Sequence, residues 1–142
     1  MRGKIAIPFI AVSEYDVPII EFHIGNGDYY AIVDTGAEST IFDSSLKKSL
    51  NVNKNIEISI VGVSGESEPQ KIVSATSKVW MKNDSGHIFI TDVTGYISDI
   101  SHLSEHFIPD NEKKISAIFG SDMLNNLNAK IDFTKRIVNF SL

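Results

Sequence analysis

The amino-acid sequence predicts an all-β protein with one or two short helices. Apolar, β-branched and aromatic residues come in short runs, and turn residues such as Gly25-Asn26-Gly27-Asp28 separate these runs. Only two short stretches have the spacing of a helix. With 142 residues, 42% of them hydrophobic and 22% charged, the chain is predicted to form one globular domain spanning residues 1–142.

The first half of the chain is predicted to hold three strands and a short helix. Pro8 marks the first strand as an edge strand or as the site of a bulge. Asp43 is a good helix cap, and Leu46 and Leu50 share one face of the helix that follows it. The predicted strands cover residues 5–12, 17–24 and 29–33, and the helix covers residues 43–50.

The second half continues the same pattern. The turn Asn83-Asp84-Ser85-Gly86 is predicted to join two strands as a hairpin. The predicted strands cover residues 56–63, 72–81, 87–93, 115–119, 129–133 and 136–142, with a short helix over residues 122–127.

Composition excludes several classes of function. A formal net charge of −5, from 13 basic and 18 acidic residues, leaves no basic surface for nucleic acid or for an anionic membrane. The absence of cysteine excludes disulfides, thiolate metal sites and cysteine nucleophiles, and it fits a reducing compartment such as the cytoplasm. No apolar run approaches the roughly 20 residues of a membrane span. Pro8 and Glu14 make the N-terminal segment a poor signal peptide.

Asp34-Thr35-Gly36 is the most informative motif, because it directly follows the apolar run of residues 29–33. This position places a carboxylate at the end of a rigid strand, on a tight turn that requires glycine. With its flanks, from Ala31 to Thr40, the segment resembles the active-site loop of retroviral-type aspartic proteases.

Two further segments occur in the order used by that family. Residues 61–65 resemble the flap that closes over a bound peptide, and their glycines permit hinge motion. Residues 117–124, followed by 129–133, resemble the strand and short helix that cross behind the catalytic loop. The resemblance implies a closed acid-protease barrel. The substrate-binding residues that it implies are Ala37, Glu38, Gly62, Val63, Ser64 and Gly65.

The resemblance also implies a chemistry, that of an aspartic endopeptidase acting on peptide or protein substrates without a metal or another cofactor. In such enzymes two carboxylates share one proton, and together they activate water and protonate the substrate carbonyl. Asp34 would be the acid and base, Thr35 would fix the geometry of the pair, and the Gly36 N–H would approach the carboxylate.

The second carboxylate is expected from a second copy of the chain. Asp84-Ser85-Gly86 is the competing motif within the chain, and its polar flank favours a plain hairpin turn. A two-fold homodimer would bring the Asp34 loop face to face with itself. The terminal strands, residues 5–10 and 136–142, are expected to be the pairing edges of that dimer.

Two departures from the retroviral pattern concern dimer stabilisation. Retroviral members often carry an arginine after the apolar-apolar-glycine segment, ion-paired to an acidic residue near the catalytic loop. Here Ser121 occupies that position, and Glu38 has no evident arginine partner.

Two alternative functions stay open at this point. One is a catalytically silent peptide-binding module on the same fold. The other is a zinc hydrolase, because His102, Glu105 and His106 match a His-x-x-Glu-His motif, although the nearby Pro109 leaves little room for a helix.

The remaining aromatic and histidine residues give no functional signal. His23 and His87 stand alone in the sequence, and Trp80 and Phe89 are expected in the core or at its lip.

Overall fold

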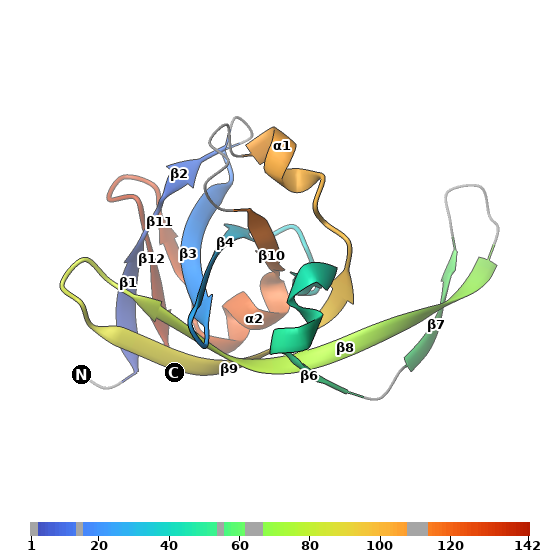
Figure 1. The fold of residues 1–142 in the computed structure, drawn as a ribbon. Helices are drawn as coiled ribbons and strands as arrows, with labels where there is room; N and C mark the ends of the chain where they lie inside the picture. The colour runs from blue at the N-terminus through green and yellow to red at the C-terminus, as the bar shows by residue number, and fades with distance from the viewer. Residues whose placement is uncertain (1–2, 14–15, 54–55, 62–66, 108–113) are drawn as a thin grey trace.

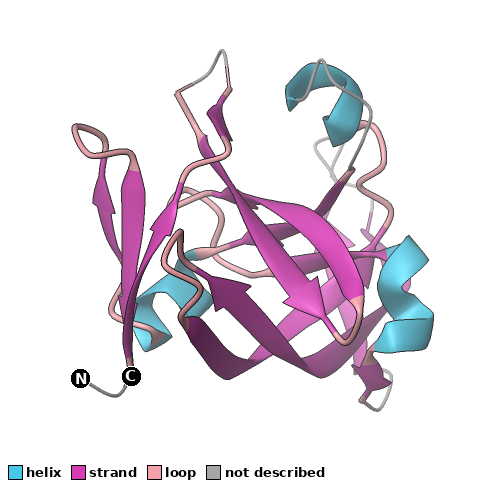
Figure 2. Cartoon of the chain, turned by 60° about the vertical axis from the view of Figure 1, so that its left-hand side comes forward, coloured by secondary structure: helices cyan, strands magenta, loops and turns pink. Residues whose placement is uncertain are grey.

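The computed structural model describes residues 3–13, 16–53, 56–61, 67–107 and 114–142. Strands dominate, and the described helices are short (Figures 1 and 2). The predicted all-β class is therefore confirmed. No helix in the described part of the chain is long and apolar enough to cross a membrane.

Six strands close into a barrel. In barrel order they are β3 (Pro18–Ile24), β4 (Gly27–Val33), β10 (Ile115–Phe119), β5 (Ile41–Asp43), β9 (Ile88–Ser98) and β8 (Ser67–Lys82), which returns to β3. Two of the pairings are parallel, β4 with β10 and β5 with β9. The return from β8 to β3 is narrow: its register holds one residue pair, His23 with Trp80.

A second, three-stranded sheet joins the two ends of the chain. Its order is β1 (Lys4–Pro8), β12 (Ile137–Ser141) and β11 (Lys130–Asp132). The Leu142 N–H also donates to the Gly3 carbonyl at 2.7 Å, so the C-terminal residue lies beside the first described residue of the chain. The expectation that both terminal strands are unpaired edges is thus wrong for β12, because β1 and β11 pair with its two sides.

The remaining elements are short. They are β2 (Ala11–Val12), the 3-10 helix η1 (Ser44–Ser49), β6 (Asn51–Val52), β7 (Ile56–Val61), α1 (Leu103–Phe107) and α2 (Ser121–Asn126). The helix predicted over residues 43–50 is a 3-10 helix, capped by Asp43, whose carboxylate accepts from the Ser45 N–H at 3.2 Å. The strand predicted over residues 5–12 is interrupted after Pro8. There the chain leaves β12 and pairs with β3 instead.

Alternation along β3 separates two apolar clusters. Ile20, Phe22 and Ile24 belong to the main core, which also contains Phe119 of β10 and Phe140 of β12. Ile19 belongs to a smaller cluster with Ile32, Ile100 and Ile115. Because side chains of a strand point alternately to opposite faces, both faces of β3 are packed in this region. This packing also supports β4, the neighbouring strand that leads into Asp34.

Candidate active site

The backbone of Asp34 is anchored to the barrel. It follows β4, whose last residue, Val33, is buried and lies opposite Phe119 in the parallel register with β10. The Asp34 N–H continues this pairing by donating to the Phe119 carbonyl at 3.0 Å. The backbone that carries the Asp34 side chain is therefore fixed by a hydrogen bond at the end of a buried strand.

The turn that follows folds back on the Asp34 carboxylate. The Gly36 N–H donates to Asp34 Oδ1 at 2.9 Å, and the Ala37 N–H donates to the Asp34 carbonyl at 3.2 Å. Gly36 does not have a positive φ. A Cβ atom there would lie 3.3 Å from Asp34 Oδ1, so the glycine serves the close approach of its N–H to the carboxylate. Asp34 is half-buried, whereas Thr35 and Gly36 are exposed.

Helix α2 supports the loop through the main chain. The Ser121 N–H donates to the Ala37 carbonyl at 2.7 Å, and the Asp122 N–H donates to the Glu38 carbonyl at 3.3 Å. At Gly120 the two segments touch: a Cβ atom there would lie 2.6 Å from the carbonyl carbon and oxygen of Ser39. The position before α2 therefore has room only for glycine.

Side chains complete this support. The Asp122 carboxylate accepts from the Thr40 N–H at 3.0 Å and from the Thr40 hydroxyl at 2.7 Å. The same hydroxyl oxygen accepts from the buried Gly120 N–H at 3.2 Å. Thr40 is fully buried, so it links the end of the loop to the start of α2 without access to water.

Thr40 and Asp122 were not recognised as positioning residues in the sequence. One sequence signal could have indicated them: Ser121 stands where retroviral members often carry an arginine, so other groups must support the loop. In its place the Asp122 carboxylate and the main chain of α2 hold the loop.

Asp84, the competing aspartate, lies in the hairpin turn between β8 and β9, as predicted. Asn83 organises this turn: its side-chain oxygen accepts from the N–H groups of Ser85 and His87 at 3.1 and 2.9 Å. Gly86 has a φ of +82° and nothing within 4 Å of where its Cβ would be. The turn is exposed, and among the described residues it has no counterpart of the support that β10 and α2 give to the Asp34 loop.

Of the five residues that resemble the flap, Gly62, Val63, Ser64 and Gly65 lie outside the described residues. The strands on either side of them are described and form a hairpin, with Val61 of β7 opposite Ser67 of β8. This hairpin extends away from the barrel at the far end of β8 (Figure 1).

The histidines and aromatics are placed as follows. His102 is exposed on the turn before α1, which is five residues long. Phe89 is a core residue, as expected. Trp80 is half-buried and stacks on His23. His23, which gave no signal in the sequence, is buried and sits between two carboxylates.

The comparison with protein families agrees with the motifs. A family model described as retroviral aspartyl protease matches residues 14–132. A solved retropepsin-like aspartic protease from Rickettsia conorii is similar with a TM-score of 0.49 and 15% identity, covering 97% of this chain and 90% of that one. A retroviral protease-like domain of Ddi1 from Leishmania major is similar with a TM-score of 0.49 and 14% identity, covering 86% of each chain. A search of curated proteins gave no match.

The match to the family model spans most of the chain, including the Asp34 loop, the six barrel strands and α2. The chain belongs to the retroviral aspartyl protease family. Its function is accordingly of the aspartic-protease type.

Proposed function

We propose that this protein is an aspartic endopeptidase whose catalytic pair is formed by Asp34 from each of two copies of the chain. The observation that carries the proposal is the Asp34 loop itself. It presents a half-buried carboxylate beside exposed Thr35 and Gly36, while hydrogen bonds from β10 and α2 hold its backbone.

The chemistry requires a pair of carboxylates with different protonation. Two like charges a few ångströms apart do not both ionise readily, so one carboxyl keeps its proton while the other accepts one. The ionised carboxylate takes a proton from water as that water attacks the peptide carbonyl. The protonated carboxyl donates to the carbonyl oxygen, and the resulting tetrahedral intermediate collapses with protonation of the leaving amine.

A second copy is proposed because, in the described part of the chain, the Asp34 loop alone combines an Asp-x-Gly turn with hydrogen bonds from β10 and α2. Asp84 lies in an exposed hairpin turn whose bonds are made by Asn83. In a two-fold dimer the same surface meets itself, so the exposed Thr35 hydroxyl of each copy would face the loop of the other. Both sides of β12 are occupied within one chain, so pairing between copies through this three-stranded sheet would use β1 or β11, its edge strands.

Residues 61–68 are proposed to cover the bound peptide. The β7–β8 hairpin that leads into this segment supports the idea, because a cover must reach beyond the barrel on a stem that is itself hydrogen-bonded. Amide exchange over residues 61–68 is expected to be fast in the free protein and slower with a bound peptide inhibitor. Equal protection in both states would contradict this role.

Mixing experiments test the dimeric mechanism. Specific activity on a peptide library is expected to rise with protein concentration and to fall when excess Asp34→Asn chains are added, because mixed dimers hold one functional carboxylate. Excess Asp84→Asn chains are the matched control and are expected not to lower specific activity, because dimers that contain them keep both Asp34 carboxylates. Activity that is independent of concentration and insensitive to the Asp34→Asn chains would contradict the dimer.

The same samples separate the alternatives. A statine-type peptide, which imitates the tetrahedral intermediate, is expected to inhibit the proposed enzyme. A silent peptide-binding module would bind peptides without hydrolysing them. A zinc hydrolase using His102 and His106 would lose activity to a chelator and resist the statine peptide.

A further inference from the structure

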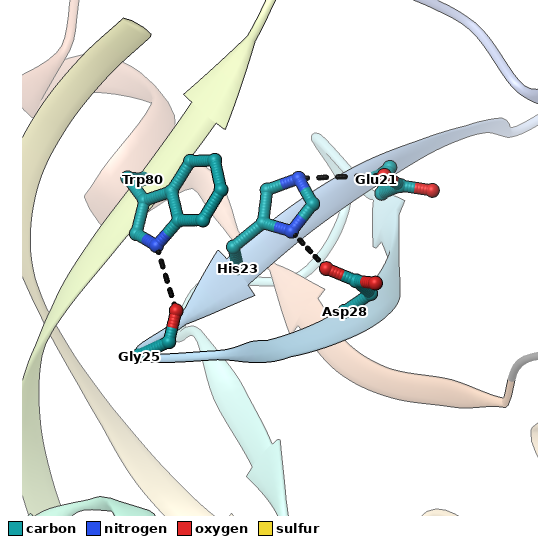
Figure 3. A network of polar contacts seen from close by, with 5 residues as sticks. All are labelled: Glu21, His23, Gly25, Asp28 and Trp80. Carbon is teal, nitrogen blue, oxygen red and sulfur yellow. Dashed lines mark hydrogen bonds and ion pairs between the residues drawn. The ribbon is translucent and has the colours of Figure 1, made fainter.

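A polar cluster lies on the barrel wall around His23 (Figure 3). Glu21 and His23 are two residues apart on β3 and therefore point to the same face, and Asp28 lies opposite His23 in the register with β4. His23 is 3% exposed, whereas the side chains of Glu21 and Asp28 are 25% and 52% exposed. Ligand atoms of the three residues all lie within 4.8 Å of one another.

The two nitrogens of the His23 ring have different surroundings. Nδ1 lies 2.6 Å from Asp28 Oδ1, a distance at which the ring N–H donates to the carboxylate. In the neutral ring this leaves the Nε2 lone pair directed toward the Glu21 side, where Oε1 lies 3.3 Å away. Two electron pairs that face each other at this distance repel unless a proton or a metal cation lies between them.

The separation of these two atoms suits a metal ion. Ligands about 2.0–2.1 Å from a tetrahedral zinc are separated from one another by about 3.3–3.4 Å. The 3.3 Å between Nε2 and Oε1 matches that edge of a tetrahedron. A carboxylate that accepts from the other ring N–H, as Asp28 does, is the usual partner of a metal-binding histidine, because it fixes the tautomer and the orientation of the ring.

We propose that His23 Nε2 and the Glu21 carboxylate bind a divalent transition-metal ion, with zinc the best fit to an imidazole and a carboxylate. Asp28 is a positioning residue that holds the His23 ring, and water completes the coordination. This site is independent of the proposed peptidase reaction. Asp28 lies near the start of β4 and Asp34 just after its end, which places the two roughly 20 Å apart at about 3.3 Å per residue.

The location gives the metal a structural role. The His23 ring stacks on the Trp80 ring, with centroids 3.9 Å apart and planes inclined by 18°. The Trp80 indole N–H donates to the Gly25 carbonyl at 3.1 Å. His23 and Trp80 are also the one residue pair in the register between β3 and β8. An ion that fixes the His23 ring therefore stabilises the β3–β8 pairing, the shortest pairing between neighbouring strands of the barrel.

Zinc titration of the chelator-treated full-length chain tests the proposal. At neutral pH, calorimetry is expected to show saturable binding of one zinc per chain, the melting temperature is expected to rise with zinc, and the His23 ring signals in the NMR spectrum are expected to shift. Asp28→Asn is expected to weaken binding by about 10–100-fold, as for other partners of metal-binding histidines. Glu21→Gln, which removes a ligand, is expected to weaken it at least as much.

His87→Gln and His102→Gln are the matched controls, because both histidines are exposed and outside the cluster. These variants are expected to bind zinc as the unmodified chain does. His23→Gln would remove the other proposed ligand, but it changes a buried side chain. Glu21→Gln changes a partly exposed side chain, so it tests the site even if His23→Gln fails to fold. No saturable zinc binding would overturn the proposal, as would binding that survives Glu21→Gln or disappears in either control.

Discussion

Two turns of this chain share nearly the same three letters and differ in everything around them. Asp34-Thr35-Gly36 follows a buried parallel strand, and its loop is bonded to β10 and α2. Asp84-Ser85-Gly86 joins two antiparallel strands, and the N–H groups of Ser85 and Gly86 donate to Asn83 within the same turn.

The glycines show the difference most directly. At Gly36 a Cβ would lie 3.3 Å from the carboxylate that accepts from its N–H, whereas Gly86 has a positive φ in open space. An Asp-x-Gly sequence is therefore compatible with both a supported functional loop and a plain hairpin turn. What distinguishes them is whether other parts of the chain hold the loop.

The largest expected effect separates the two aspartates by activity. Asp34→Asn is expected to lower peptidase activity by about 1,000-fold, because an amide retains the shape of the side chain but does not transfer the proton. Asp84→Asn is expected to leave activity unchanged. Both are measured as kcat/KM on one cleaved peptide, with circular dichroism confirming the fold. Comparable losses in the two variants, or none in either, would contradict the proposed role of Asp34.

The next effect separates the two turns by their packing. Gly120→Ala is expected to lower the free energy of unfolding by about 3 kcal/mol, because the new methyl group would overlap the backbone of Ser39. Gly86→Ala is expected to cost about 1 kcal/mol, since it strains φ without a clash. Urea unfolding at equilibrium measures both, and equal costs would mean that the Gly120 contact relaxes easily.

A smaller effect tests the hydroxyl of Thr40. Thr40→Val is expected to cost about 2 kcal/mol, because it leaves the buried Gly120 N–H without its acceptor and removes a donor to Asp122. Thr40→Ser keeps the hydroxyl and is expected to cost less. Asn83→Ala in the other turn is expected to cost about 0.5 kcal/mol or less, because water can replace its bonds to the N–H groups of the exposed residues Ser85 and His87. If Thr40→Ser lowers the free energy of unfolding as much as Thr40→Val does, the effect comes from packing and not from the hydroxyl.

The smallest expected effect concerns the pKa of Asp99, an exposed carboxylate that accepts hydrogen bonds only from its own turn among the described residues. At Asp99, hydrogen bonds from the Ser101 N–H and hydroxyl, at 3.0 and 2.7 Å, lower the carboxyl pKa. A lowered pKa in the folded state gives stability that is present above the unfolded-state pKa and is lost as pH falls through the folded-state pKa. Ser101→Ala is expected to raise the Asp99 pKa toward its usual value in an NMR titration. An unchanged pKa would mean that the Ser101 hydroxyl does not contribute to lowering the Asp99 pKa.

Much of the secondary structure was predictable because its signals are local. The strand at residues 115–119 agrees with the prediction, and most other elements differ by a few residues at their ends. β9 extends to Ser98, beyond the predicted residue 93, because its later residues pair with β5 as well as with β8. β5 was not predicted as a strand, because its three residues are stabilised by neighbours on both sides and not by their own pattern.

The sequence by itself determined the all-β class, the position of Asp34 after a buried strand, and the hairpin turn at Asp84. These features follow from alternation and turn chemistry, which act over a few residues. The tertiary structure decided which segments meet: Thr40 with Asp122, Gly120 with Ser39, and His23 with Trp80 and two carboxylates. Except for the carboxylates near His23, these partners lie far apart in the chain. Which of them meet depends on packing the barrel as a whole, and no local propensity specifies that.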